Sequence, residues 1–250
     1  MSSNIAFKAF ASALVASWVP VAAFAQHPTE PAWPNTMNND PFVGYAILNQ
    51  NEIRTGNGTT TYRWDGEGWY GGNINRAWFK TEGNLDARTG ALDDTEVQTF
   101  YSRAISPFFN LQAGARYDFG NIPGQGWAIF GVEALAPFFF DVGAHTFISS
   151  DGHLGARLDG SYDLYVTQRF MLQPQIEMNF YGKRDARRGT GSGLSDIDTG
   201  LRLRYEVTRE FAPYVGVAYE GKFGGSAALA RAAGEPTGSV RLTLGIRLWI

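Results

Sequence analysis

The stretch DTEVQTFYSRAISPFFNLQAGARYDF, residues 94–119, carries the clearest structural pattern in the chain. From Phe109 to Phe119 every second residue is apolar, and the residues between them are polar or glycine. This two-residue period indicates a β-strand with one apolar face and one polar face. A second run, residues 97–103, is separated from it only by the short segment 104–107. The stretch therefore predicts a long β-hairpin.

A long hairpin with one apolar face occurs in two kinds of protein. In a soluble sandwich or barrel the apolar face points inward, whereas in a membrane barrel it points outward into lipid. The composition suits the membrane barrel, because the chain has 30 glycines, 14% aromatic residues and only 18% charged residues. Glycine serves tight turns, and aromatic residues serve the membrane interfaces. The 250 residues suffice for one large all-β domain.

Charge and cysteine content exclude several classes of function. The formal net charge of −3 shows no basic excess, so nothing points to nucleic acid as a partner. The chain has no cysteine, which excludes thiolate metal sites and cysteine nucleophiles.

The N-terminus has the pattern of an export signal. Lys8 precedes an apolar stretch, residues 9–22, which is followed by Ala23-Phe24-Ala25. A secretory signal has this order of charge, apolar segment and small-residue cleavage site, so we predict a signal peptide over residues 1–25. Residues 26–41 are rich in Pro and Asn and show no periodicity. They predict a flexible periplasmic arm.

The remaining chain predicts about twelve strands, with ten as the lower bound. The connections alternate in length, for example residues 105–106 against residues 182–194. Outer-membrane barrels have an even strand count, short periplasmic turns and longer extracellular loops. We therefore predict a closed antiparallel transmembrane β-barrel over residues 42–250, in the outer membrane, with both ends of the barrel on the periplasmic side. The expected strands are residues 45–54, 60–70, 75–84, 94–104, 108–119, 127–136, 138–149, 153–166, 170–181, 195–207, 211–223 and 239–250.

The two faces of the expected strands differ in chemistry. One parity of the late strands carries charges of both signs, including Asp196, Asp198, Arg202 and Arg204, which suits a polar lumen. The final segment SVRLTLGIRLWI, residues 239–250, has an unbroken apolar parity suited to lipid. Aromatic girdles are expected at the two membrane interfaces. The residues assigned to these girdles are Trp64, Trp69, Tyr70, Trp127, Tyr214, Trp249 and the run 138–140 of three phenylalanines.

Several blocks of the sequence resemble one bacterial family. WDGEGWYGG (64–72) with FKTEG (79–83) is similar to the first conserved block of the copper resistance protein B family, and YSRAISPF (101–108) with QAGARYD (112–118) is similar to the second. The remaining similar blocks are GSGLSD (191–196), LRLRYE (201–206), EFAPY (210–214) and RLW (247–249).

The resemblance covers residues 42–250. It implies an outer-membrane barrel of Gram-negative bacteria that contacts lipid, acts in copper resistance, and binds copper ions or assists their export from the periplasm. It also implies a periplasmic multicopper oxidase as a partner. Many members of the family carry a long arm rich in Met and His, whereas the arm here holds only His27 and Met37.

Copper favours imidazole and thioether ligands, so His27, Met37, His145 and His153 are candidate ligands. His145 and His153 share the polar parity of two strands joined by a short outer loop. A hairpin centred on residue 149 would place the two imidazoles opposite each other, with Cβ atoms about 5 Å apart. A hairpin centred on residue 150 would place them diagonally. Asp141 and Asp159 are expected to add oxygen ligands. The plain alternative is that both histidines are ordinary hydrated residues of the lumen.

Two other functions are alternatives to copper handling. A lipid hydrolase of the outer membrane would need its Ser and His on the lipid-facing side, but His145 and His153 fall on the polar parity. We therefore predict no enzyme activity. The other alternative is a narrow outer-membrane channel or a structural barrel without a metal site, because a twelve-strand barrel is narrow and dense mixed charges can plug it.

Overall fold

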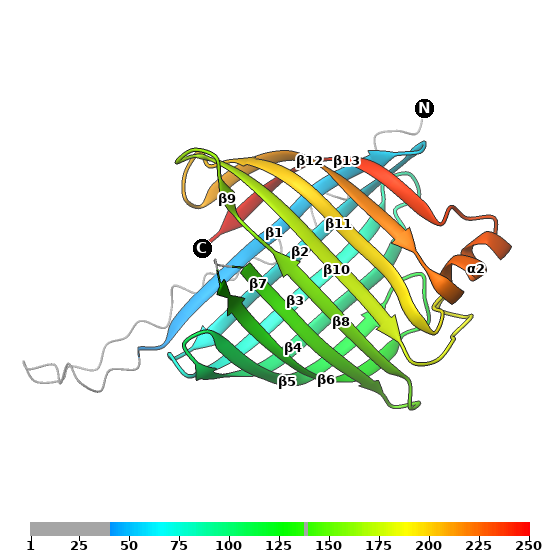
Figure 1. The fold of residues 1–250 in the computed structure, drawn as a ribbon, viewed down its shortest axis with the longest axis horizontal. Helices are drawn as coiled ribbons and strands as arrows, with labels where there is room; N and C mark the ends of the chain where they lie inside the picture. The colour runs from blue at the N-terminus through cyan, green and yellow to red at the C-terminus, as the bar shows by residue number, and fades with distance from the viewer. Residues whose placement is uncertain (1–40, 138–139) are drawn as a thin grey trace, which may run out of the picture. The chain divides into compact units, whose positions relative to one another are not determined.

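The computed structural model describes residues 41–137 and 140–250, and it confirms the closed β-barrel (Figure 1). The predicted signal peptide and nearly all of the predicted arm, with His27 and Met37, lie outside the described residues. No helix in the described part of the chain is long and apolar enough to cross a membrane. The elements are β1 (Val43–Gly56), β2 (Thr59–Gly71), β3 (Asn75–Asp86), β4 (Leu92–Ser106), β5 (Phe109–Phe119), β6 (Gln125–Ala136), β7 (Phe140–Ser149), β8 (Leu154–Ser161), β9 (Leu164–Tyr165), β10 (Phe170–Tyr181), β11 (Gly193–Tyr205), β12 (Phe211–Lys222), α2 (Gly224–Ala232) and β13 (Gly238–Trp249).

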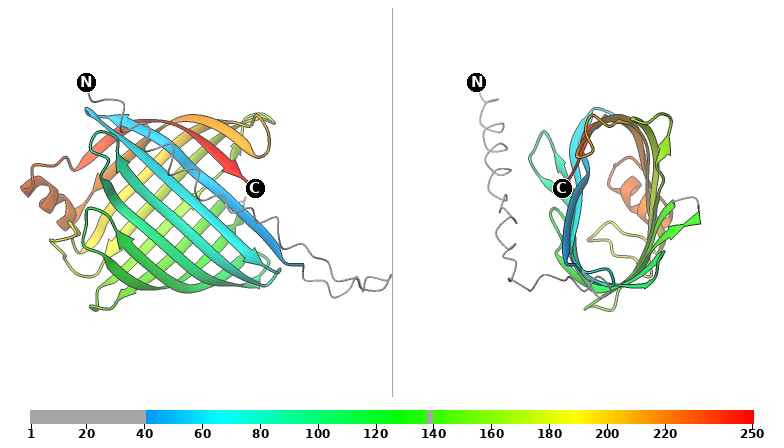
Figure 2. Two further views of the ribbon diagram at one scale, coloured as in Figure 1. Left: turned by 180° about the vertical axis from the view of Figure 1, so that it is seen from behind. Right: turned by 90° about the vertical axis from the view of Figure 1, so that its left-hand side faces the viewer.

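The barrel closes where the first strand meets the last. β1 pairs antiparallel with β13, with Ile47 opposite Trp249 and Thr55 opposite Leu242. All other neighbours follow in chain order and are antiparallel. β8 and β9 both pair with β10, one after the other, and so share one position in the wall. The described residues thus form a twelve-strand barrel, which is a closed ring when seen along its axis (Figure 2).

One expected strand is interrupted. Residues 153–166 were expected to be continuous, but the chain leaves the ladder between Ser161 and Leu164. The β7–β8 pairing ends at Asp141 opposite Ser161, because β7 itself begins at Phe140. Beyond that point β9 has only β10 to pair with. The Tyr162 ring, between the two parts, stacks on Phe140 with a centroid separation of 4.3 Å.

The sorting of the connections is confirmed by the two longest loops, which both lie on the outer side. The periplasmic turns span residues 72–74, 107–108, 137–139, 166–169 and 206–210, and the longest outer loops are residues 182–192 and 223–237. The outer side also has short connections, namely the four-residue loop between β7 and β8 and the two-residue turn between β1 and β2. Asn57 and Gly58 have φ values of 51° and 75°, the left-handed conformations that a two-residue hairpin turn requires and that Asn-Gly adopts readily.

The two faces of the wall have the predicted chemistry. On β13, Val240, Leu242 and Leu244 point outward and are each more than 60% exposed. On β5, Gln112, Arg116 and Asp118 point inward and are buried. The wall therefore presents apolar side chains to lipid and encloses a polar lumen.

The predicted girdles are partly wrong. Trp127 and Tyr214 are buried inside the barrel, on the same parity as the buried residues Ile129 and Ala212. Trp69 and Trp249 also face the lumen, where they line cavities with Glu67 and Arg204, respectively. Tyr70 is exposed, as expected. Trp127 belongs to an apolar cluster within the lumen, which we call the lumen cluster. It comprises Phe100, Trp127, Ile129 and Phe147, with Trp78 and Tyr181 packed against it.

Candidate functional site

A cavity of about 480 Å³ occupies the periplasmic part of the lumen. Tyr45, Arg76, Asp163 and Arg247 line it near the strand ends that carry the termini, and Glu82 and Arg157 line it deeper in the barrel. The described lining residues include eight Asp or Glu side chains and only four Lys or Arg side chains. The cavity is therefore suited to attract cations from the periplasmic end.

His145 is the one imidazole that lines this cavity among the described residues. It points inward from β7, is buried, and its ring centroid lies 5.8 Å from that of Phe100. Its Nε2 lies 3.1 Å from Oε1 of Gln112 on β5, and its Nδ1 lies 3.7 Å from Oδ1 of Asp159 on β8. Contacts from β4, β5 and β8 thus hold the ring in one orientation.

The contact between His145 and Asp159 favours a cation. His145 can carry its proton on Nδ1, facing Asp159, or on Nε2, where Oε1 of Gln112 accepts the hydrogen bond and Nδ1 is left unprotonated. In the second case Nδ1 and the Asp159 carboxylate present lone pairs to each other across 3.7 Å. A proton on the ring or a metal ion between the two atoms relieves this repulsion. Metal bonds to imidazole nitrogen and carboxylate oxygen are about 2 Å each, so a separation of this size accommodates a metal ion.

Asp141 lies on the same inward-facing ladder. The β7–β8 register places Gly143 opposite Asp159 and Asp141 opposite Ser161. Inward positions alternate along each strand, so Asp141 and Asp159 are diagonal neighbours on the lumen face. Their carboxylates can interact only through a group that bridges them. Both line the cavity with His145. The structure therefore brings three of the six candidate ligands into one part of the lumen.

The structure does not bring His153 there. The hairpin is centred on residue 151, so His153 lies opposite Ser149 at the outer loop, and its backbone N–H donates to Ser149 Oγ at 3.0 Å. The prediction that His145 and His153 lie opposite or diagonal to each other is wrong. The hairpin is centred one or two residues further along the chain than predicted, and this shifts His153 away from His145. His27 and Met37 lie outside the described residues.

A lysine lies among the carboxylates of the cavity. Nζ of Lys80 on β3 forms an ion pair with Glu133 of β6 and lies 3.5 Å from Oε2 of Glu67 on β2. It also lies 5.2 Å from the centroid of the Trp78 ring. Within residues 41–137 and 140–250 no three His, Asp or Glu side chains are close enough together to hold a metal ion by themselves. Water would have to complete the coordination of an ion at His145 and Asp159.

Above the cavity a continuous series of ion pairs crosses the lumen, and we call it the ion-pair chain. Each member contacts the next with N–O separations from 2.5 to 3.9 Å. Charges alternate along it, so every buried charge has a partner of opposite sign. In order the members are Arg188, Asp118, Arg116, Glu96, Arg157, Glu82, Arg63, Asp198, Arg54, Glu52 and Arg202.

The strand pattern predicts a ladder of charges in the lumen, but it does not identify every side chain that contacts His145 or Lys80. Gln112, which orients His145, and Glu133, which holds Lys80, were not singled out. Both lie on the inward parity of their strands, and this parity was the available signal. Their partners lie on strands that are not adjacent to theirs, and sequence periodicity does not show which of them meet across a lumen.

Comparison with protein families decides the identity of the chain. The family model described as "Copper resistance protein B precursor (CopB)" matches residues 42–250. The chain belongs to the copper resistance protein B family. It is 42% identical over 205 residues to "Copper resistance protein B homolog" of Pseudomonas syringae pv. tomato, a match that covers 82% of this chain and 69% of the relative. It is 37% identical over 212 residues to "Copper resistance protein B" of Escherichia coli, covering 84% and 71%.

Solved structures support the fold alone. The NanC porin superposes with a TM-score of 0.54 at 14% identity, covering 82% of this chain and 99% of the porin. This likeness and the family together identify an outer-membrane β-barrel of the copper resistance protein B family. The predicted fold class and the predicted location in the outer membrane are thereby confirmed.

Proposed function

We propose that this barrel binds copper ions weakly in its periplasmic cavity, at His145 and Asp159, and so assists their export from the periplasm. The observation that carries the proposal is the 3.7 Å approach of His145 Nδ1 to Asp159 Oδ1 in a cavity with an excess of carboxylates. Imidazole nitrogen is a good ligand for copper, and carboxylate oxygen completes a mixed donor set.

Several features of the lumen support this role. Asp141 lies nearer the cavity entrance than Asp159 and would meet an entering cation first. Two protein ligands among the described residues, His145 and Asp159, approach one point, which suits an ion that must be released again rather than held permanently. His27 and Met37 are further proposed ligands in the arm. We further propose a periplasmic multicopper oxidase as a partner of the barrel.

Copper titration of the refolded mature chain tests the proposal. The mature chain, His145→Ala and His153→Ala would be titrated with Cu²⁺ by calorimetry and examined by electron paramagnetic resonance. We expect nitrogen coordination in the wild type and in His153→Ala, because His153 lies at the outer loop. Loss of that signal in His145→Ala would support the lumen site.

A background variant separates the arm from the lumen. In His27→Ala/Met37→Ala the lumen site should keep its copper signal. If the signal disappears in this background and persists in His145→Ala, the ligands lie in the arm and the lumen site is wrong. If no form binds copper, the alternative of a narrow channel or a structural barrel without a metal site is favoured.

A further inference from the structure

The outer loop between β10 and β11, residues 182–192, sends one side chain back into the barrel. The Arg188 side chain is only 6% exposed. Its Nη2 lies 2.5 Å from Oδ2 of Asp118 on β5, and its Nη1 donates to the carbonyl oxygen of Pro123 at 2.7 Å. Its guanidinium also lies 5.9 Å from the centroid of the Trp127 ring. This loop is therefore anchored across the lumen, to the wall formed by β5 and β6.

The same loop is held from its other side by the helix α2. The backbone N–H of Gly191 donates to Ser226 Oγ at 2.6 Å, and Ser226 Oγ lies 2.8 Å from Ser195 Oγ. The approach is so close that a Cβ on Gly191 would lie 2.3 Å from the backbone nitrogen of Ser226. Seen along the barrel axis, the loop and α2 lie within the outline of the ring (Figure 2).

The loop side chain is also the outer end of the ion-pair chain. Arg188 contacts Asp118, which contacts Arg116, and the series continues inward to Arg157 at the wall of the cavity. The only ion-pair partner that Arg188 has among the described residues is Asp118. Asp118 is held independently of the loop, because it also accepts hydrogen bonds from Arg116 Nε and Trp127 Nε1. The loop can therefore move away from the lumen while Asp118 keeps its hydrogen bonds to Arg116 and Trp127.

We propose that residues 182–192 form a lid over the extracellular end of the lumen, and that the Arg188–Asp118 contact is its latch. Small cations pass between the cavity and the exterior only when this latch opens. The inference concerns closure of the lumen and does not depend on copper binding.

Conductance in planar lipid bilayers tests the lid. The full mature chain would be reconstituted in potassium chloride without copper, so that failure of the copper proposal cannot affect the result. The wild type should be mostly closed. Arg188→Ala should raise the open fraction about tenfold or more, because it removes a charge-assisted hydrogen bond that holds the closed state.

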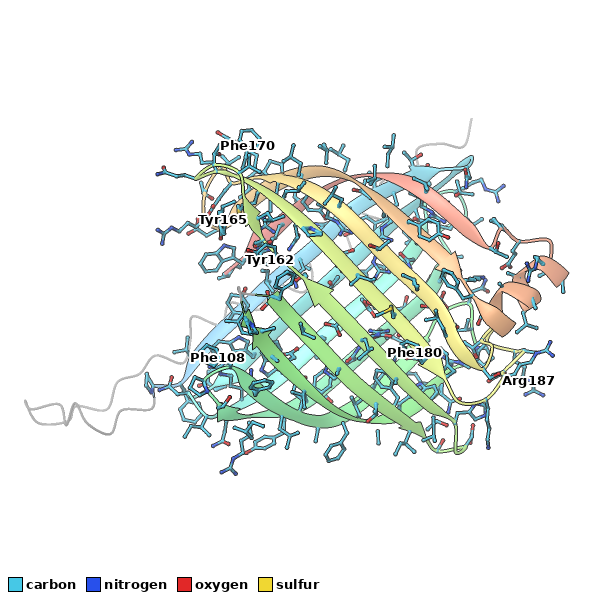
Figure 3. All side chains as sticks on the ribbon, in the orientation of Figure 1. Phe108, Tyr162, Tyr165, Phe170, Phe180 and Arg187 are labelled. Atoms are coloured by element: carbon cyan, nitrogen blue, oxygen red, sulfur yellow. The ribbon has the colours of Figure 1, made fainter. Side chains whose placement is uncertain are left out.

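A neighbouring arginine provides the matched control. Arg187 is exposed at the tip of the same loop, at the end of the barrel opposite Tyr165 and Phe170 (Figure 3). Arg187→Ala removes the same charge from the loop and should behave as the wild type. Arg188→Lys keeps the charge at the latch and should remain mostly closed.

Two results would overturn the proposal. One is an Arg188→Ala protein that is folded, by its heat-modifiable migration on gels, but conducts no more than the wild type. The other is an equal rise in Arg187→Ala, which would assign the effect to net charge. If Arg188→Ala does not fold, Arg188→Gln retains most of the side chain without its charge, and the same comparison applies to it.

Discussion

The β7–β8 register places His145 directly opposite Arg157. The proposed copper ligand therefore lies beside the arginine that joins the cavity to the ion-pair chain. Arg157 Nη1 contacts Glu82 at 2.6 Å and Glu96 at 2.9 Å, and its Nε lies 3.2 Å from Glu177. Three carboxylates from three strands converge on this one guanidinium, whereas the imidazole next to it contacts one carboxylate, that of Asp159, within the described part of the chain.

A small change on β7 should weaken copper binding without altering any ligand. A Cβ at Gly143 would lie 2.4 Å from both carboxylate oxygens of Asp159, at the movable end of that side chain. Gly143→Ala should therefore push Asp159 away from His145. Loss of a positioned carboxylate partner lowers metal affinity by about tenfold, which calorimetric titration with Cu²⁺ would measure. In the control Gly160→Ala the new Cβ meets only ordinary contacts. Equal affinity in the two variants would contradict the site.

Removal of Arg157 should destabilise the barrel. Arg157→Gln leaves Glu82 and Glu96 without their shared partner in a lumen where both are mostly buried. Breaking a buried ion pair from one side costs about 3–5 kcal/mol, so the urea midpoint of unfolding in detergent should fall clearly. Arg184→Gln, in the exposed part of the outer loop, should leave that midpoint unchanged. A similar midpoint in both variants would show that the ion-pair chain does not stabilise the fold.

The lumen cluster should contribute more to stability than an aromatic residue on the lipid face. Trp127 is buried, and its Nε1 donates to Asp118 at 2.8 Å. Trp127→Ala should cost about 3–5 kcal/mol of unfolding free energy, because it opens a cavity in a packed region. Phe130, on the same strand, is 62% exposed on the outer face. Phe130→Ala should lower the unfolding free energy by less. Urea unfolding, followed by the fluorescence of the remaining tryptophans, measures both variants. A larger loss in Phe130→Ala would contradict the inward placement of Trp127.

An engineered disulfide should report how closely α2 lies on β11. The hydroxyl oxygens of Ser195 and Ser226 are 2.8 Å apart, and the chain has no other cysteine to compete. Ser195→Cys/Ser226→Cys should therefore oxidise spontaneously, and mass spectrometry should find the loss of two hydrogens. The single variant Ser226→Cys should give no intramolecular bond. A double variant that stays reduced in air would show that α2 does not rest on β11 as described.

The periodicity of the chain was sufficient to predict the barrel, its approximate strand count and the sorting of its loops. Alternation in residues 109–119 and 239–250 assigns each side chain to the lipid face or the lumen face, because successive residues of a strand point to opposite sides. Gln112 and Leu244 lie on their expected faces. Local pattern was also sufficient to identify His145 and Asp159 as lumen residues.

What the sequence did not determine is which lumen residues meet. A shift of the β7–β8 register exchanges the partner of His145, and the register depends on how the outer loop closes. Contacts such as Arg188 with Asp118, or Lys80 with Glu133, join strands that are far apart in the sequence and are separated by the width of the lumen. Trp127 shows the same limit, because an aromatic residue suits a membrane interface or a packed interior equally well. Alternation determined the face of each residue, and only closure of the barrel decided its partner.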